Sequence, residues 1–191
     1  SIYPRVKKIS QVINNPLTEK TVASNEQKQR SRKKLGLSQE GLIFGNAGWL
    51  IKRKRFDIFL NLAARIKKKY PSAQFLIAGD GEEKNSLMQL SHDLGISEDI
   101  IWLGWQENLE DFYNSLDFLI FNSDWDAVGL SPLEAVLKGI YLIASVENGG
   151  LSELLINEHQ FFFHHEHDFE TLMKKIIYIL ENPLVAHELI M

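Results

Sequence analysis

The sequence of 191 residues contains no cysteine, and none of its apolar runs reaches the ~18 residues that a membrane-spanning helix needs. Without cysteine there is neither a disulfide framework nor a thiolate metal site, which agrees with a reducing compartment, so we expect a cytoplasmic protein. A large charge excess is also missing, and the net charge of -4 gives no indication of a nucleic-acid partner. The chain begins Ser1-Ile2-Tyr3-Pro4, without an initiator methionine or an apolar signal core, and we expect it to be part of a longer protein.

Residues 1–40 are polar and patchily basic, and we interpret them as an interdomain linker in which Asn14-Asn15-Pro16 predicts a turn. The basic run from Gln27 to Leu37 predicts a short helix that ends at Gly36. We interpret this run as a solvated face of the linker. Two alternatives stay open: a surface for anionic lipid, with peripheral attachment to the inner face of a membrane, or contact with a domain absent from this chain.

From residue 41 to 191 short apolar runs alternate with amphipathic stretches, which predicts one domain. Strands are expected at 42–45, 74–79, 100–104, 118–121, 141–145 and 161–163, and helices at 56–69, 82–94, 109–115, 132–137, 152–155 and 169–180. Strands that are apolar on both faces and alternate with helices indicate an α/β protein with a doubly wound parallel sheet, a Rossmann-like fold.

Ligands of such sheets bind beyond the carboxyl ends of the strands, where the strand order reverses. The loops expected to form the site therefore follow Phe44, Ala78, Leu103, Phe121 and Ser145. The first of these loops lacks the Gly-x-Gly-x-x-Gly spacing of dinucleotide-binding dehydrogenases, which argues against that class.

Two carboxylates eight residues apart, Asp126 and Glu134, flank Gly129 in the loop and helix after the fourth strand. Gly129 suits either a positive φ or a close ligand approach, and with Leu130 it can offer amides at a helix start, where an anion is favoured. The segment Ser131-Pro132-Leu133-Glu134 predicts a capping box, so Glu134 is either a cap in the first turn or an acceptor for two ribose hydroxyls. Asp126 is either a turn former or a contact to a transferred group.

A basic run, Lys52 to Arg55, follows Gly48-Trp49 at the end of the first strand. It is either solvated or supplies one cation to a diphosphate, and the pattern does not say which of the four. Gly149-Gly150 after the fifth strand is either a flexible turn or a place where the backbone approaches a sugar ring. The histidines between 159 and 167 match no compact set of metal ligands, so no metal is expected.

Together these segments resemble the donor-binding, C-terminal domain of retaining glycosyltransferases of the GT-B fold, in group 1, family 4. Four stretches carry the resemblance in order along the chain: 48–57, 76–81, 121–135 and 143–153. The resemblance implies a domain at 41–191 that binds a nucleotide-diphosphate sugar. It also implies an N-terminal acceptor domain that is absent from this chain.

The resemblance also implies roles for single residues. Lys54 would bind the diphosphate, Glu134 the ribose, and Asp126 would lie beside the donor sugar in a catalytic position. Gly129 and Leu130 would give backbone contacts to phosphate. Because Lys54 and the helix start would steady the leaving diphosphate, no metal or other cofactor is expected.

Further members of the donor site are implied at its rim: Gly48, Trp49, Trp105, Gly149 and Gly150, with Trp105 flanking the base. Two positions depart from the family. Trp49 stands where an arginine is usual, with Lys52, Arg53 or Arg55 as candidates to compensate for it. Asp126 is one methylene shorter than the usual glutamate.

The function that follows is transfer of a sugar from UDP or GDP to a glycan or glycolipid acceptor held by the absent domain. This chain alone would then bind the donor weakly and transfer nothing. The alternative is a nucleotide-sugar binding module that has lost catalysis. The departures at Trp49 and Asp126 favour this alternative.

Overall fold

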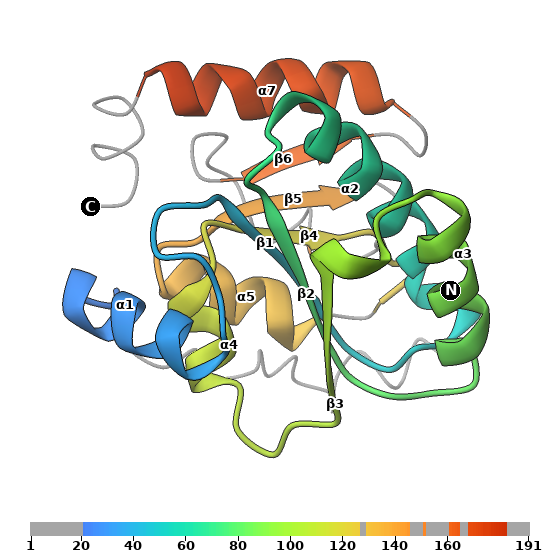
Figure 1. The fold of residues 1–191 in the computed structure, drawn as a ribbon, viewed down its shortest axis with the longest axis horizontal. Coiled ribbons are helices and arrows are strands. Elements are labelled where there is room, and N and C mark those ends of the chain that lie inside the picture. Colours follow the sequence, from blue (N-terminus) through green and yellow to red (C-terminus); the bar gives the residue numbers. More distant parts are fainter. Residues whose placement is uncertain (1–20, 127–128, 146–150, 152–160, 165–167, 183–191) are drawn as a thin grey trace, which may run out of the picture.

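The computed structural model describes residues 21–126, 129–145, 151, 161–164 and 168–182, and within them a six-stranded parallel sheet has the order β3-β2-β1-β4-β5-β6 (Figure 1). The strands are β1 (Ile43–Ala47), β2 (Gln74–Ala78), β3 (Ile100–Gly104), β4 (Phe118–Phe121), β5 (Tyr141–Ser145) and β6 (Phe161–His164). The predicted doubly wound α/β fold is confirmed. The strand order reverses between β1 and β4, which pair side by side.

Two layers of helices cover the sheet (Figure 1). One layer holds α2 (Phe56–Lys69), α3 (Lys84–Asp93) and α7 (Phe169–Glu181), and the other holds α1 (Asn25–Lys34), α4 (Glu110–Ser115) and α5 (Leu130–Leu137). Single turns of 3-10 helix lie at η2 (Lys52–Lys54) and η3 (Ser97–Asp99). No helix in the described part of the chain has the length and apolar character to cross a bilayer. The helix expected at 152–155 lies outside the described residues.

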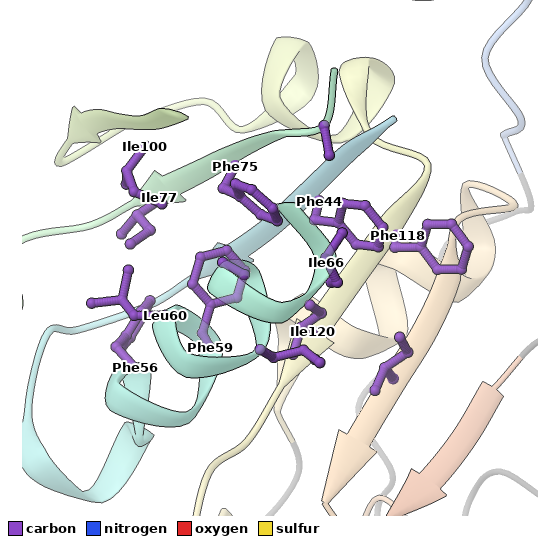
Figure 2. Packing of buried hydrophobic residues seen from close by; sticks show 14 of the residues in the cluster. Phe44, Phe56, Phe59, Leu60, Ile66, Phe75, Ile77, Ile100, Phe118 and Ile120 are labelled. Carbon is purple, nitrogen blue, oxygen red and sulfur yellow. The ribbon is translucent and has the colours of Figure 1, made fainter. Parts of the chain in front are cut away.

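Successive residues of each strand serve opposite layers, because side chains alternate across a sheet. In β4, Phe118 and Ile120 pack under the α2 layer, whereas Leu119 and Phe121 pack under the α4 layer. Under α2 the rings of Phe44 and Phe118 stack with centroids 4.9 Å apart (Figure 2). Burial on both faces explains why these strands read as unbroken apolar runs in the sequence.

The predicted helix in the basic N-terminal run is confirmed as α1, which begins with a capping box at Ser24 and is followed by Gly36 at φ 70°. The interpretation of that run as a wholly solvated face is wrong for three residues, because Ser31, Arg32 and Leu37 are buried. The Arg32 guanidinium forms an ion pair with Asp117 at 2.7 Å. This contact fastens α1 to the start of β4.

Candidate functional site

A cavity of about 440 Å³ opens at the carboxyl ends of β1 and β2, beside the start of α5. Its lining includes most of the residues predicted for the site: Gly48, Trp49, Lys54, Trp105, Asp126, Gly129, Leu130 and Glu134. Gly149 and Gly150 lie outside the described residues. The predicted location, at the reversal of strand order, is therefore where the structure has this cavity.

Lys54 reaches the cavity from η2, the single helical turn that follows β1. The turn ends at Arg55, whose left-handed backbone, with φ 49° and ψ 46°, leads directly into α2. The Lys54 side chain is 16% exposed; its ammonium group forms an ion pair with Asp126 and lies 5.2 Å from the centroid of the Phe121 ring. The Phe121 ring and the Asp126 carboxylate thus hold the Lys54 ammonium at the site.

The neighbouring basic side chains are engaged elsewhere. Arg53 donates to the carbonyl of Trp125 at 2.8 Å, and Arg55 pairs with Asp57 and Asp124. Lys52 lines a separate cavity of about 350 Å³. Of the four basic residues only Lys54 lines the site, so the expectation that another would compensate for Trp49 finds no support in the described residues.

The turn that follows β2 requires a glycine at position 79. Gly79 has φ 145°, and a Cβ atom there would lie 1.9 Å from the carbonyl oxygen of Gly48. The amide of Gly48 in turn donates to the Ala78 carbonyl at 2.9 Å. The turns after β1 and β2, at Gly48 and Gly79, therefore lie close together where they line the cavity.

The capping box predicted at Ser131 is wrong. Helix α5 begins at Leu130 with Gly129 as its N-cap and without a side-chain cap, so Glu134 is the fifth helical residue and lies beyond the first turn. The Ser131 hydroxyl instead donates weakly to the Ala47 carbonyl, at 3.4 Å. The sequence pattern misplaced the helix start because a glycine N-cap gives no side-chain signal.

Gly129 does not have the positive φ that was one of its two explanations, since its φ is -66°. A Cβ atom at this position would lie 2.7 Å from Cζ of Phe121, so packing requires the missing side chain. The close fit brings the start of α5 onto the end of β4. No acidic residue occupies the first turn of α5, whose residues Leu130 and Ser131 line the cavity, so no side chain of that turn offsets the positive end of the helix dipole.

Glu134 is exposed and lines the cavity, and no ion pair engages it within the described residues. Opposite it lies Tyr113 of α4, which is 3% exposed and whose hydroxyl has no hydrogen-bond partner of ordinary geometry there. Burial, with smaller contributions from the hydrogen-bonding contact and then the negative charge of the nearby Glu134 carboxylate, raises the pKa of Tyr113 far above its usual range. The phenol therefore stays protonated and can donate a hydrogen bond at the site.

Tyr113 was not among the predicted site residues, and neither were Leu109, Gln106 and Ser131, which also line the cavity. A signal for two of them was available. Leu109 and Tyr113 are four residues apart at the start of α4, and this spacing gives them a common helix face.

Two tryptophans form the rim of the cavity. Trp49 and Trp105 are each 61% exposed, and their rings meet edge to face with centroids 5.8 Å apart. Large aromatic side chains with so much exposed area are suited to stacking on a flat ligand group. Among the described residues no group of three histidine or acidic side chains is arranged to hold a metal ion.

The fold and the site together define a domain with a cavity that is lined by the Lys54 ammonium, the start of α5, the Glu134 carboxylate and two tryptophan rings. The chain belongs to the glycosyl transferases group 1 family, whose model matches residues 27–190. Among its relatives are the lipopolysaccharide core biosynthesis glycosyltransferase LpsE of Rhizobium meliloti and the O-antigen biosynthesis glycosyltransferase WclY of Escherichia coli. LpsE is 27% identical over 62% of this chain and 34% of its own length, and WclY 28% identical over 74% and 38%.

Solved structures share the fold. Anabaena HepE in complex with UDP-glucose superposes with a TM-score of 0.77 at 21% identity, covering 88% of this chain and 46% of that one. The C-terminal domain of the group 1 protein LpcC from Francisella tularensis gives 0.75 at 20% identity and covers 90% of both chains. The fold is thus that of a GT-B C-terminal domain, and the chain spans about a third of the length of the relatives it matches by sequence.

Proposed function

We propose that this chain is the donor-binding domain of a retaining glycosyltransferase that uses a nucleotide-diphosphate sugar. The observation that carries the proposal is that Lys54, the start of α5 and Glu134 line one cavity at the reversal of strand order. These are three different binding chemistries, and a sugar nucleotide has a group for each of them. A simple anion site would need neither the carboxylate nor the aromatic rim.

The diphosphate is assigned to Lys54 and the first turn of α5. The backbone amides of Leu130 and Ser131 have no partner within the helix, and the helix dipole favours an anion at this end. Pro132 has no amide hydrogen, but in the first turn this costs the helix no hydrogen bond. Lys54 and these dipoles stabilise the charge that develops on the leaving diphosphate, in a mechanism that uses no metal cofactor.

The nucleoside is assigned to the other half of the cavity. The Glu134 carboxylate accepts from the ribose hydroxyls, and the protonated Tyr113 donates a hydrogen bond nearby. Trp105 stacks on the base, and Trp49 closes the same rim. UDP is the first candidate because HepE has been solved with UDP-glucose, with GDP as the second.

Sugar transfer requires an acceptor, which we assign to an N-terminal domain absent from this chain. The names of LpsE and WclY support a glycan or glycolipid acceptor, and a glycolipid would bring the enzyme to a membrane surface. Asp126 lies beside Lys54 and is the residue we assign to the donor sugar. On this proposal the 191-residue chain alone transfers no sugar.

The proposal is tested by titrating the chain with UDP-glucose and GDP-mannose, beside a Glu134→Gln variant. One of the two donors is expected to bind and to raise the melting temperature, since a ligand of the native state stabilises it by mass action. Glu134→Gln is expected to weaken that binding by about tenfold, the loss of a charge-assisted hydrogen-bond acceptor. Calorimetric titration measures both affinities.

The same variant separates a ligand role from a helix cap. Because Glu134 is exposed and caps no amide, Glu134→Gln should change the free energy of unfolding by less than about 0.5 kcal/mol. A lower stability with unchanged nucleotide affinity would mean that Glu134 supports the helix only, and would remove it from the site.

The aromatic rim gives a second, independent prediction. Trp105→Ala should weaken nucleotide binding by about 1–2 kcal/mol, since stacking on an aromatic ring contributes 1–3 kcal/mol per base. Trp125 is equally exposed at 59% but does not line the cavity, and Trp125→Ala serves as the matched control. Inorganic pyrophosphate, which has no base, should bind wild type and Trp105→Ala equally.

A further inference from the structure

The cation of the site already has a protein counter-ion. The Lys54 ammonium is bound by the Asp126 carboxylate, and neither side chain is more than one-fifth exposed. A diphosphate that binds Lys54 must therefore displace a carboxylate that is largely shielded from water.

We propose that Asp126 selects the intact nucleotide sugar over the free nucleoside diphosphate by competing for Lys54. This inference rests on the proposed function, and it adds a property of the site: discrimination between substrate and product. In this role Asp126 is a specificity-determining residue.

The surroundings of the pair hold both partners in place. Lys54 lies against the Phe121 ring, and Asp126 accepts a long hydrogen bond from the Ser123 hydroxyl at 3.4 Å. The Ser123 hydroxyl is shared with the backbone carbonyls of Arg53 and Trp125, at 3.4 and 3.3 Å. Among the described residues Lys54 is the only cation paired with Asp126. When a phosphate binds Lys54, the Asp126 carboxylate therefore loses its only counter-ion in this part of the chain.

The two ligands differ in what they offer to the released carboxylate. An intact donor carries sugar hydroxyls beyond its second phosphate, and hydroxyls donate hydrogen bonds to a carboxylate. A free nucleoside diphosphate offers no donor there, and its terminal phosphate adds negative charge beside Asp126. When the intact donor binds, its sugar hydroxyls therefore replace Lys54 as partners of Asp126, and the free energy of displacing Lys54 is close to balanced. When the free diphosphate binds, Asp126 is left unpaired, which is unfavourable because an unpaired charge in a partly buried place is costly.

The test compares Asp126→Asn with wild type by calorimetric titration, using UDP against UDP-glucose and GDP against GDP-mannose. Asp126→Asn should tighten the binding of the free diphosphate by about fivefold, because it removes the competing charge from a pair whose side chains are less than one-fifth exposed. Binding of the sugar-bearing donor should stay equal or weaken, so the preference of the protein for the donor falls.

Asp124→Asn is the matched control, since it removes the same charge two residues away. Asp124 pairs with Arg55 and does not line the cavity, so its variant should leave the ratio of the two affinities unchanged. Thermal melts check that each variant is folded, and Asp126→Ser, which also removes the charge, replaces Asp126→Asn if the latter does not fold.

Two outcomes overturn the inference, and they are distinguishable from failure of the proposed function. If wild type binds nucleotides but Asp126→Asn does not tighten the free diphosphate, or tightens both ligands equally, competition for Lys54 does not select between them. If wild type binds neither pair of nucleotides, the proposed function fails and this inference fails with it.

Discussion

Lys54→Ala is expected to lower the affinity of the chain for a nucleoside diphosphate by about 30- to 100-fold, the loss of a charge-assisted contact of ~2–3 kcal/mol. The effect is large because Lys54 alone of its basic run lines the cavity and because its ammonium is shielded from water. The variant also leaves the Asp126 carboxylate without its counter-ion, which adds repulsion against an incoming phosphate. Calorimetric titration with UDP and GDP measures the loss.

Lys52→Ala is the control for this experiment. It removes the same charge from the same helical turn, but Lys52 lines the neighbouring cavity and should leave affinity within about twofold of wild type, the effect of a screened surface charge. Equal losses for both variants would mean that the basic run attracts the ligand only through its summed charge, and Lys54 would lose its specific role.

Arg32→Ala is expected to cost about 3 kcal/mol of unfolding free energy, measured by urea denaturation, although it lies far from the cavity. Arg32 is 4% exposed. It donates to the carbonyls of Ser115, Gln39 and Gly41 at 3.0–3.1 Å and pairs with Asp117. Its removal takes a donor from three carbonyls at once and leaves Asp117 with Lys28 as its remaining cation among the residues that the structure describes.

Arg30→Ala on the same helix is the matched control. Arg30 is exposed and, within the described part of the chain, pairs only with Glu26, four residues earlier, at 3.2 Å, so its loss should cost less than about 0.5 kcal/mol. If Arg32→Ala were as mild as Arg30→Ala, α1 would be a loosely attached segment and the linker interpretation of residues 1–40 would extend to it. Nucleotide affinity should be unchanged in both variants.

The strands were predictable because burial on both faces leaves a run of apolar residues that few other elements produce. The bounds of β3, β4 and β5 agree with the sequence prediction at both ends. Strand β1 continues two residues further than predicted, to Ala47, because its pairing with β2 continues to Ala78. That pairing is a property of the sheet, and a single run of residues does not reveal it.

Residues of the site were predictable where a loop or motif marked them. They were not predictable where contacts with residues distant in the sequence determine the role of the side chain. Arg32 reads as one more basic residue of a polar run, since its partner Asp117 is 85 residues away. From the sequence Tyr113 is predicted as a core residue of α4, and its burial agrees with that. Only the structure shows that it also lines the cavity beside Glu134, where its hydroxyl can contact a ligand. The sequence also could not identify Lys54 as the site residue within Lys52 to Arg55. The structure identifies it because η2 directs Lys52 and Lys54 into different cavities.

A crystal structure of the chain with UDP-glucose or GDP-mannose, whichever binds more tightly, tests the central claim most directly. The account predicts phosphate oxygens about 3 Å from Nζ of Lys54 and from the amides of Leu130 and Ser131, with the ribose hydroxyls on Glu134. A diphosphate held instead in the neighbouring cavity, by Lys52 and Arg55, would contradict it.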